Sequence, residues 1–151
     1  MKKIYVIIII ITFSISCSNR SDSGTSIVFH KTHEPKKENA PFSDIVQVGD
    51  LYFLSGQIGM NHSTRKLVTG GITEETKQTL ENIKAVLKHH NMDMNNVVKC
   101  TVVLADIKDF VAFNEVYKAY FPQKPARTTF AAKGLAVGAK IEIECIAAKS
   151  E

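Results

Sequence analysis

The sequence predicts one α+β domain in which two helices pack on one face of a mixed β-sheet. Its 151 residues, 44% of them hydrophobic, suffice for one ordinary domain with a core and are too few for two. From about residue 27 onward, short β-rich runs alternate with two amphipathic helical patterns. Disordered, collagenous and coiled-coil proteins have a different balance of residues. We therefore expect a single domain at residues 27–151.

The first strands are expected at 27–29, 45–48 and 51–55, where β-branched and aromatic residues gather. The dipeptide Gly49-Asp50 separates the last two runs and is typical of a β-hairpin connection. Residues 61–71 are polar and end in glycine, which predicts a loop.

The first helix is expected to begin after Thr73, because a threonine hydroxyl can cap a helix N-terminus. Glu74 and Glu75 would then place negative charge in the first turn, where the helix dipole favours it. The helix is expected to end at residues 89–91. Its apolar stripe has helical spacing and consists of Leu80, Ile83 and Leu87.

Asp109 is expected to cap a second helix, which has a mostly aromatic stripe and ends before Pro122. The β-branched run 97–104 between the helices is nearly continuous in its hydrophobicity, as in a central strand. The runs 127–132 and 141–148 complete the sheet. Two helices on one face leave the other face bare and apolar, which predicts a homo-oligomer.

The chain contains three cysteines, an odd number that does not make a disulfide framework. Cys100 and Cys145 fall in apolar strand-like runs and are expected to be buried thiols. Cys17 lies near the N-terminus, in a different context.

Residues 1–16 are typical of a secretory signal peptide. Lys2 and Lys3 precede the apolar run 4–11, and small residues follow that run. The run is too short to span a hydrocarbon core of about 30 Å, which takes about 20 apolar helical residues. Removal of the two lysines lowers the formal net charge from +4 to +2. That charge does not indicate the clustered basic face of a nucleic-acid-binding protein.

Cys17 predicts a lipid anchor. The stretch Ser14-Ile15-Ser16-Cys17 resembles the bacterial lipoprotein box, with Ser14 where a leucine is usual. Residues 17–26 would then be a lipidated cysteine followed by a polar, flexible tether. We expect a membrane-anchored lipoprotein of the bacterial cell envelope, and the alternative is an exported soluble protein.

Arginine and glutamate side chains in the predicted sheet could carry chemistry. Arg127 opens a strand, and its guanidinium could bind a carboxylate through two parallel hydrogen bonds. A surface arginine paired with an acid would show the same pattern. Glu142 and Glu144 alternate with apolar residues and therefore share one sheet face. One of them could orient a water molecule as a general base, and a solvated strand face is the other interpretation.

Ser55-Gly56 ends the hairpin, where glycine lets a ligand approach the backbone, although an ordinary bulge would explain it equally well. Asn114 could face either solvent or a pocket. The five histidines show no metal-ligand spacing, because His89 and His90 point about 100° apart on a helix. No phosphate-binding loop, nucleophile elbow or zinc signature is present, so we expect neither metal nor cofactor.

Together these segments resemble the RidA (YjgF) family of enamine/imine deaminases. The similarity runs from about residue 27 to the C-terminus and keeps the family's spacing and order. The stretches that carry it are 55–58, 79–87, 113–117, 125–129 and 141–147.

The resemblance implies a chorismate-mutase-like fold and a homotrimer with ligand clefts between its subunits. It also implies hydrolysis of 2-imino acids to 2-keto acids and ammonia, without metal or cofactor. By position in the motifs, Arg127 would bind the substrate carboxylate and Glu142 would position the attacking water. The two side chains are expected to converge from neighbouring strands at a seam between protomers.

The same resemblance places five further residues at the cleft. The backbone amide of Thr129 would face the ligand. The residues that line the cleft would be Phe42, Ser55, Gly56 and Asn114.

This chain departs from the family pattern at three of its positions. The family's usual Pro-Tyr-Ser-Gln stretch is Pro41-Phe42-Ser43-Asp44 here, so a tyrosine hydroxyl is replaced by hydrogen and an amide by an acid. Phe42 can form an aromatic wall but cannot donate a hydrogen bond. Thr129 stands where many members have a cysteine.

Two functions are consistent with these residues. The first is hydrolytic deamination of 2-imino acids. The second is a non-catalytic envelope lipoprotein that binds a small carboxylated metabolite or a protein partner through the inter-subunit cleft, motivated by Phe42, Asp44 and the lipid anchor. A ribonuclease role, known for some relatives, is disfavoured because the sequence shows no basic stripe or paired histidines.

The substitution Cys17→Ala is expected to abolish fatty-acid labelling and to shift the protein from the membrane to the soluble fraction, because the acyl chains supply the anchor. Metabolic labelling with palmitate followed by fractionation measures both effects. Cys145→Ala is the matched control, since it removes a cysteine but keeps Cys17, the predicted site of lipid attachment. Unchanged membrane fractionation of the Cys17→Ala protein would contradict the anchor.

Overall fold

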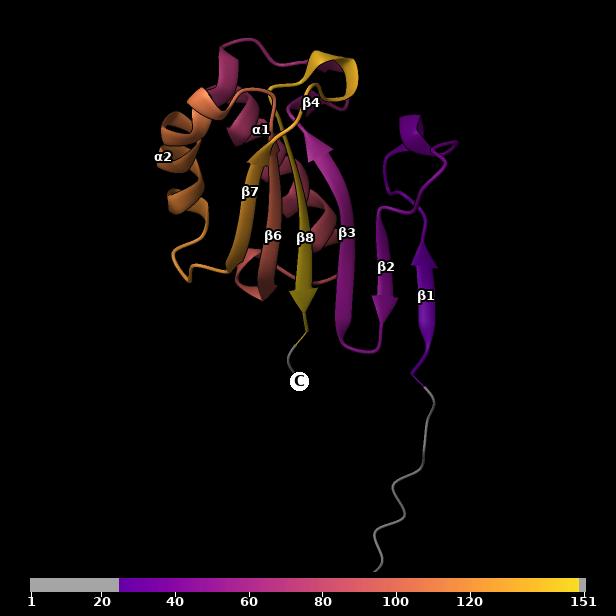
Figure 1. Cartoon of the computed structure of the whole chain (residues 1–151). Coiled ribbons are helices and arrows are strands. Elements are labelled where there is room, and N and C mark those ends of the chain that lie inside the picture. Colours follow the sequence, from indigo (N-terminus) through magenta and orange to yellow (C-terminus); the bar gives the residue numbers. More distant parts are fainter. Residues whose placement is uncertain (1–24, 150–151) are drawn as a thin grey trace, which may run out of the picture.

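The computed structural model describes residues 25–149, so the expected signal peptide and Cys17 lie outside the described residues. Two helices, α1 (Gly71–His89) and α2 (Phe110–Tyr120), cover one face of a six-stranded sheet (Figure 1). The strands of the sheet are β1 (Ile27–His30), β2 (Ile45–Val48), β3 (Leu51–Ile58), β6 (Val97–Leu104), β7 (Ala126–Ala131) and β8 (Ile141–Ala148).

The strand order is β1-β2-β3-β8-β6-β7. Strands β6 and β7 are parallel and joined through α2, while every other neighbouring pair is antiparallel. The expected mixed sheet with two helices on one face is therefore confirmed. Strand β8 lies inside the sheet between β3 and β6, and β7 forms an edge.

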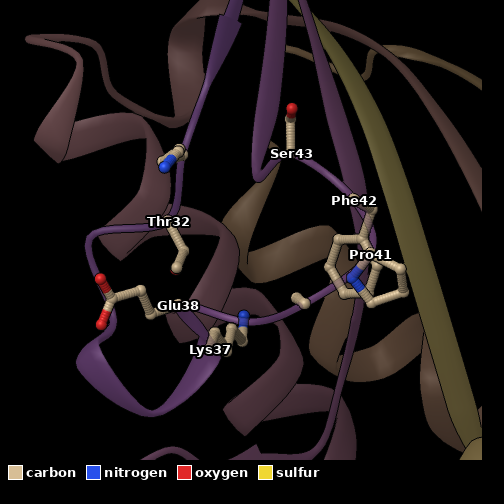
Figure 2. A pocket seen from close by; sticks show the side chains of 8 residues that line it. Thr32, Lys37, Glu38, Pro41, Phe42 and Ser43 are labelled. Carbon is tan, nitrogen blue, oxygen red and sulfur yellow. The ribbon is translucent and has the colours of Figure 1, made fainter.

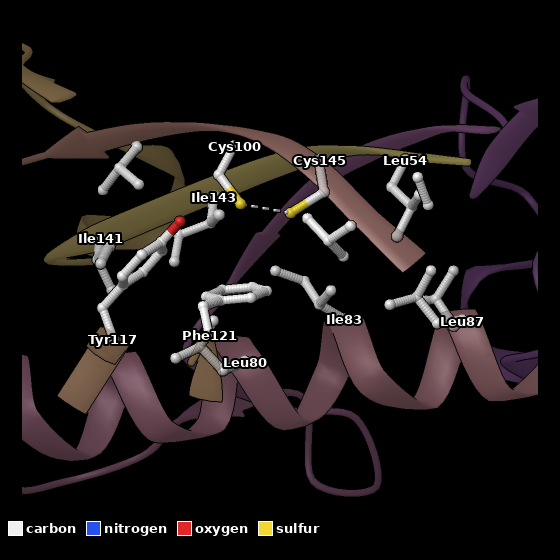
Figure 3. Close-up of a cluster of buried hydrophobic side chains, with 14 of the residues drawn as sticks. Leu54, Leu80, Ile83, Leu87, Cys100, Tyr117, Phe121, Ile141, Ile143 and Cys145 are labelled. Carbon is white, nitrogen blue, oxygen red and sulfur yellow. Dashed lines mark hydrogen bonds between the residues drawn. The ribbon is translucent and has the colours of Figure 1, made fainter. Parts of the chain in front are cut away.

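The core lies between the sheet and the two helices (Figure 3). Side chains alternate along β8, so that Ile141, Ile143 and Cys145 are buried while Glu142 and Glu144 face the other side. The predicted apolar stripes of both helices supply the opposite wall of the core. The buried side chains that the helices contribute include Leu80, Ile83, Leu87, Phe113 and Tyr117.

The start of α1 differs from the prediction. The helix begins at Gly71, and the residue before it, Gly70, has a φ of 113°, which a residue with a side chain rarely adopts. Thr73 therefore lies inside the first turn and is not the N-cap. Glu75 is also not a surface charge, because it is buried and accepts a hydrogen bond of 2.8 Å from the Lys140 backbone amide. That bond ties α1 to the segment before β8.

Two other local predictions were wrong in part. Asp109 occupies the N-cap position of α2 but makes no side-chain capping bond, because a 3-10 turn at Ile107–Asp109 precedes the helix. Asp106 starts that turn and accepts a hydrogen bond of 2.9 Å from the Lys108 amide. The expected loop 61–71 includes part of a small ladder formed by β4 (Met60–Asn61) and β5 (Lys66–Leu67).

The face of the sheet away from the helices is called here the open face. The prediction that it is bare and apolar holds at one end only, because Glu142 and Glu144 also lie on it. Alternation along the strands places the side chains of Ile27, Phe29, Leu51 and Phe53 on it. Phe29 is 70% exposed. A patch of this kind normally marks an interface. Between residues 25 and 149, no helix has the length and apolarity to span a bilayer.

Four histidines gather where the C-terminus of α1 meets the chain just after β1, which their sequence spacing did not predict. The rings of His30 and His90 are 4.6 Å apart, and those of His33 and His89 are 5.0 Å apart. Burial lowers the pKa of His90, and positive charge on the three neighbouring imidazoles lowers it further, while Asp44 acts in the opposite direction.

The free energy of unfolding is expected to fall as the pH drops below 6.5, the ordinary pKa of His90. The folded chain resists protonation at His90, whereas the unfolded chain accepts the proton, so acid favours unfolding. Urea denaturation at about pH 7.5 and about pH 5.5 measures the loss. The His90→Gln variant should lose less stability over this interval than the wild type, and an equal loss in both proteins would contradict the assignment.

Candidate functional site

The structure sorts the predicted site residues into two groups. Phe42, Ser55, Gly56 and Glu142 lie near the end of β3 and the start of β8, and we call them the Glu142 half-site. The second group, called the Arg127 half-site, belongs to α2 and to the edge strand β7. Its members are Asn114, Arg127 and Thr129.

Gly56 leaves room for the carboxylate of Glu142. A Cβ atom built on Gly56 would overlap Oε1 of Glu142, so any side chain at this position would displace the acid. The ladder between β3 and β8 is irregular between Leu54 and Gln57; it resumes with Gln57 opposite Ile143, and Ile58 then pairs with Glu142. The structure therefore shows a strand irregularity at Gly56, which was the alternative to a ligand contact, and the group close to the glycine is Glu142.

Ser55 fastens the loop that carries Phe42 to β3. Its hydroxyl donates a hydrogen bond of 2.6 Å to the Ser43 carbonyl, and its backbone amide donates one of 3.0 Å to the Asp44 carbonyl. Because the hydroxyl proton is used in this way, Ser55 can only accept a hydrogen bond from a ligand.

Phe42 is half exposed and lines two hollows. The first, of about 270 Å³, lies between Phe42 with Pro41 and the side chains of Thr32 and Lys37 (Figure 2). The second, of about 220 Å³, is mostly apolar and also has Lys37 in its wall. Phe42 therefore presents its ring to both hollows, and Lys37 is its charged neighbour in each.

Asp44, the acid that replaces the family's amide, is buried to 1% exposure. Its two carboxylate oxygens make no hydrogen bond; they lie 3.8 Å from Lys37 Nζ and 3.6 Å from His33 Nδ1. Burial lowers the pKa of Lys37, and the charge of Asp44 opposes that shift. Lys37 and Asp44 therefore place an ammonium group and a carboxyl group close together behind the Phe42 loop. The amide that the family usually has at position 44 would carry no charge.

Partial burial raises the pKa of Glu142, and the like charge of Glu144 two residues further along raises it more. Both carboxylates lie on the open face, as their spacing predicted. A carboxylate with a raised pKa can exchange a proton with water near neutral pH more readily than an ordinary one.

Arg127 is held in place before any ligand arrives. Its Nη1 donates a hydrogen bond of 2.8 Å to Asn114 Oδ1, and its guanidinium carbon lies 4.6 Å from the centre of the Tyr117 ring. The rings of Phe113 and Phe110 follow at 5.2 and 5.7 Å. Arg127, Asn114 and Tyr117 border a hollow of about 440 Å³ in which Arg127 supplies a cation suited to a carboxylate.

The two half-sites do not meet within one protomer. Arg127 pairs with the buried Cys100 and faces α2, whereas Glu142 faces away from the helices. Strand β6 also separates β7 from β8, so the expectation that Arg127 and Glu142 lie on neighbouring strands was wrong. Alternation of side chains along each strand puts the two residues on opposite faces of the sheet, and β6 lies between their strands. A single ligand could contact both side chains only at a junction between protomers.

The residues that position Arg127 could not be identified from the sequence pattern. Tyr117, Phe113 and Phe110 were expected only as the apolar stripe of a helix, and their contact with Arg127 depends on how α2 packs over β7. Within residues 25–149, no three histidine, cysteine or acidic side chains are arranged to hold a metal ion.

The fold and the two half-sites define a small α+β protein with an arginine held beneath α2 and a separate acid on the open face of its sheet. The chain belongs to the endoribonuclease L-PSP family, whose family model matches residues 32–149. This is the RidA (YjgF) family that the sequence resembles, and the α+β fold agrees with its solved members.

Individual relatives agree with this membership. The 2-iminobutanoate/2-iminopropanoate deaminase of Mus musculus is 47% identical over 108 residues, which cover 71% of this chain and 80% of the mouse protein. The yeast protein YEO7 has a TM-score of 0.77 at 38% identity, over 83% of this chain and 100% of its own. The E. coli protein TdcF, solved with bound serine, has a TM-score of 0.69 at 31% identity, over 74% and 90% of the two chains.

The substitution Glu144→Gln is expected to lower the pKa of Glu142 part of the way toward its ordinary value, because it removes the like charge and leaves the burial. Carbon NMR titration of the glutamate carboxyl groups measures the change. Glu115→Gln, which removes an exposed acid paired with Lys118 on α2, is the matched control and should have no effect. A pKa of Glu142 that stays the same in Glu144→Gln would contradict the coupling.

Proposed function

We propose that this chain is an enzyme that hydrolyses 2-imino acids to 2-keto acids and ammonia. The observation that carries the proposal is the Arg127 guanidinium, fixed by Asn114 and three aromatic rings beside an open hollow. The name of the mouse relative, a 2-iminobutanoate/2-iminopropanoate deaminase at 47% identity, supports the same reaction.

Arg127 would bind the substrate carboxylate. Its planar guanidinium can donate two parallel hydrogen bonds to the two carboxylate oxygens, which fixes the direction of the substrate as well as its charge. Because Asn114 and the rings already hold the side chain, little conformational entropy is lost when the substrate binds. The serine bound to TdcF, a relative of this chain, also carries a carboxylate.

Glu142 would handle water and protons. Water attacks the imine carbon, which is electrophilic when its nitrogen is protonated, and Glu142 accepts the proton that the water loses. The carbinolamine nitrogen then takes that proton from Glu142, and the C–N bond breaks to release ammonia. The hydroxyl oxygen returns its proton to Glu142 as the C=O bond of the 2-keto acid forms. The raised pKa of Glu142 suits these proton transfers.

The proposal includes a homotrimer in which Arg127 of one protomer faces Glu142 of the next. Within one protomer these side chains lie on opposite faces of the sheet. The exposed apolar end of the open face, which includes Phe29 and Phe53, supplies a surface that a second protomer could cover. Closed rotational symmetry would repeat the same junction at each subunit boundary.

The export predicted from residues 1–17 remains part of the proposal. An envelope location would give the enzyme carboxylated imines or similar substrates that are stable enough to reach it. The alternative, a non-catalytic protein that binds a small carboxylate, is favoured by Phe42 in place of the family's tyrosine and by Asp44 in place of its amide.

Arg127→Ala and Glu142→Gln are each expected to lower kcat/KM by about 100-fold or more, because one removes the carboxylate partner and the other the proton acceptor. The assay measures ammonia release from imino acids generated by an amino-acid oxidase. The two inactive variants, mixed at equal amounts and reassembled, should regain about one quarter of wild-type activity. In random trimers, about one junction in four combines an intact Arg127 from one protomer with an intact Glu142 from the next.

Asn95→Ala, a substitution of an exposed residue outside both half-sites, is the control for folding and reassembly. Full activity of either single variant would overturn its assigned role. Failure of the mixture to regain activity, with trimers intact, would overturn the shared junction. A wild-type protein that binds 2-ketobutyrate without releasing ammonia would establish the binding alternative instead.

A further inference from the structure

A pair of thiols lies in the core directly behind the Arg127 half-site. Cys100 and Cys145 are opposite each other in the antiparallel β6–β8 ladder, and their sulfur atoms are 3.3 Å apart (Figure 3). Both side chains are buried, and both sulfurs are free thiols. The cysteines therefore need only a small movement of their side chains to reach bonding distance.

The two thiols are chemically unequal. The hydrogen bond from Cys145 lowers the pKa of Cys100, and the positive charge of Arg127 lowers it further, although burial opposes both effects. The same hydrogen bond and burial raise the pKa of Cys145. Cys100 is thus the more acidic sulfur, and the thiolate is the form that reacts with oxidants.

Tyr117 connects this pair to Arg127. Its ring lies 4.6 Å beneath the guanidinium, and its buried hydroxyl points toward the Cys100 sulfur (Figure 3). No oxygen or nitrogen atom bonds that hydroxyl, so the Cys100 thiol is its polar neighbour. Tyr117 also lines the 440 Å³ hollow beside Arg127, and one aromatic side chain therefore lies between the thiols and a route from solvent.

We propose that Cys100 and Cys145 form a reversible disulfide on exposure to a peroxide, and that this bond weakens carboxylate binding by Arg127. The second half of the inference rests on the proposed function. The first half concerns only the thiols and stands independently of it.

The reaction balances with hydrogen peroxide as the oxidant. The Cys100 thiolate attacks one peroxide oxygen, an S–O bond forms, the O–O bond breaks, and the departing hydroxide is protonated to water. The Cys145 sulfur then attacks the sulfenic acid sulfur, an S–S bond forms, the S–O bond breaks, and a second water leaves with the Cys145 proton. Two thiols are oxidised and one peroxide is reduced to two waters.

Disulfide formation would remove the thiol that faces Tyr117. The Tyr117 hydroxyl faces the Cys100 sulfur as a donor. A disulfide sulfur is a weaker acceptor than a thiolate, and it moves toward Cys145, so the buried hydroxyl is left without its neighbour. The Tyr117 ring would shift toward the adjacent hollow to solvate its hydroxyl. Arg127 would lose the nearest of the rings that hold it.

The test uses the full-length chain carrying Cys17→Ser, so that only Cys100 and Cys145 remain. After native treatment with hydrogen peroxide, denaturation and alkylation with iodoacetamide, the expected product carries no alkyl group and has lost the mass of two hydrogen atoms. Dithiothreitol should restore two alkylatable thiols. Adding Cys145→Ala is the matched control, because it keeps the Cys100 sulfur and removes the only thiol with which it could form the intramolecular disulfide.

Two alkylated thiols after peroxide treatment, or a sulfinic acid in place of the disulfide, would overturn the proposal. In the second measurement, oxidation should raise KM for an imino acid about three- to tenfold, the range of one partly buried cation–π contact, with a smaller change in kcat. An unchanged KM in the oxidised protein would overturn the coupling to Arg127. A disulfide in a protein without deaminase activity would overturn the proposed function and leave the thiol pair standing.

Discussion

The alternation of side chains along the strands is the constraint on which the rest of the molecule depends. One set of residues in β8 enters the core beneath the helices, and the set between them, including Glu142, must face outward. In β7 the same geometry turns Arg127 toward the helix side. No change of rotamer can bring a guanidinium and a carboxylate together through a hydrogen-bonded sheet. Under the proposed function, a second protomer is therefore a component of the site.

Each half-site is organised before a ligand binds. Asn114 and three aromatic rings hold Arg127, while the absence of a side chain at Gly56 makes space for Glu142. Such preorganisation removes part of the entropic cost of positioning a substrate and a water molecule. Under the proposed function, a second protomer would also cover the apolar end of the open face.

The elements with continuous or strictly alternating patterns could be predicted closely from the sequence. The β-branched run at 97–104 and the alternating run at 141–148 coincide with β6 and β8. The predictions of helix N-termini were wrong where a residue nearby in the sequence, and not the expected one, begins the helix or turn. Gly70, with its positive φ, starts α1 ahead of Thr73, and Asp106 caps the turn ahead of Asp109. Capping depends on the backbone path into the helix, and residue type alone does not specify that path.

By itself, the sequence determined the fold class, the family, the buried thiols and the shared face of Glu142 and Glu144, because these follow from local periodicity and motif spacing. Only the tertiary structure decided that β6 separates β7 from β8, that Arg127 packs on Tyr117 and that four histidines meet beside α1. These contacts join residues far apart in the chain. They depend on strand order and helix packing, which the whole core sets and which no single segment encodes.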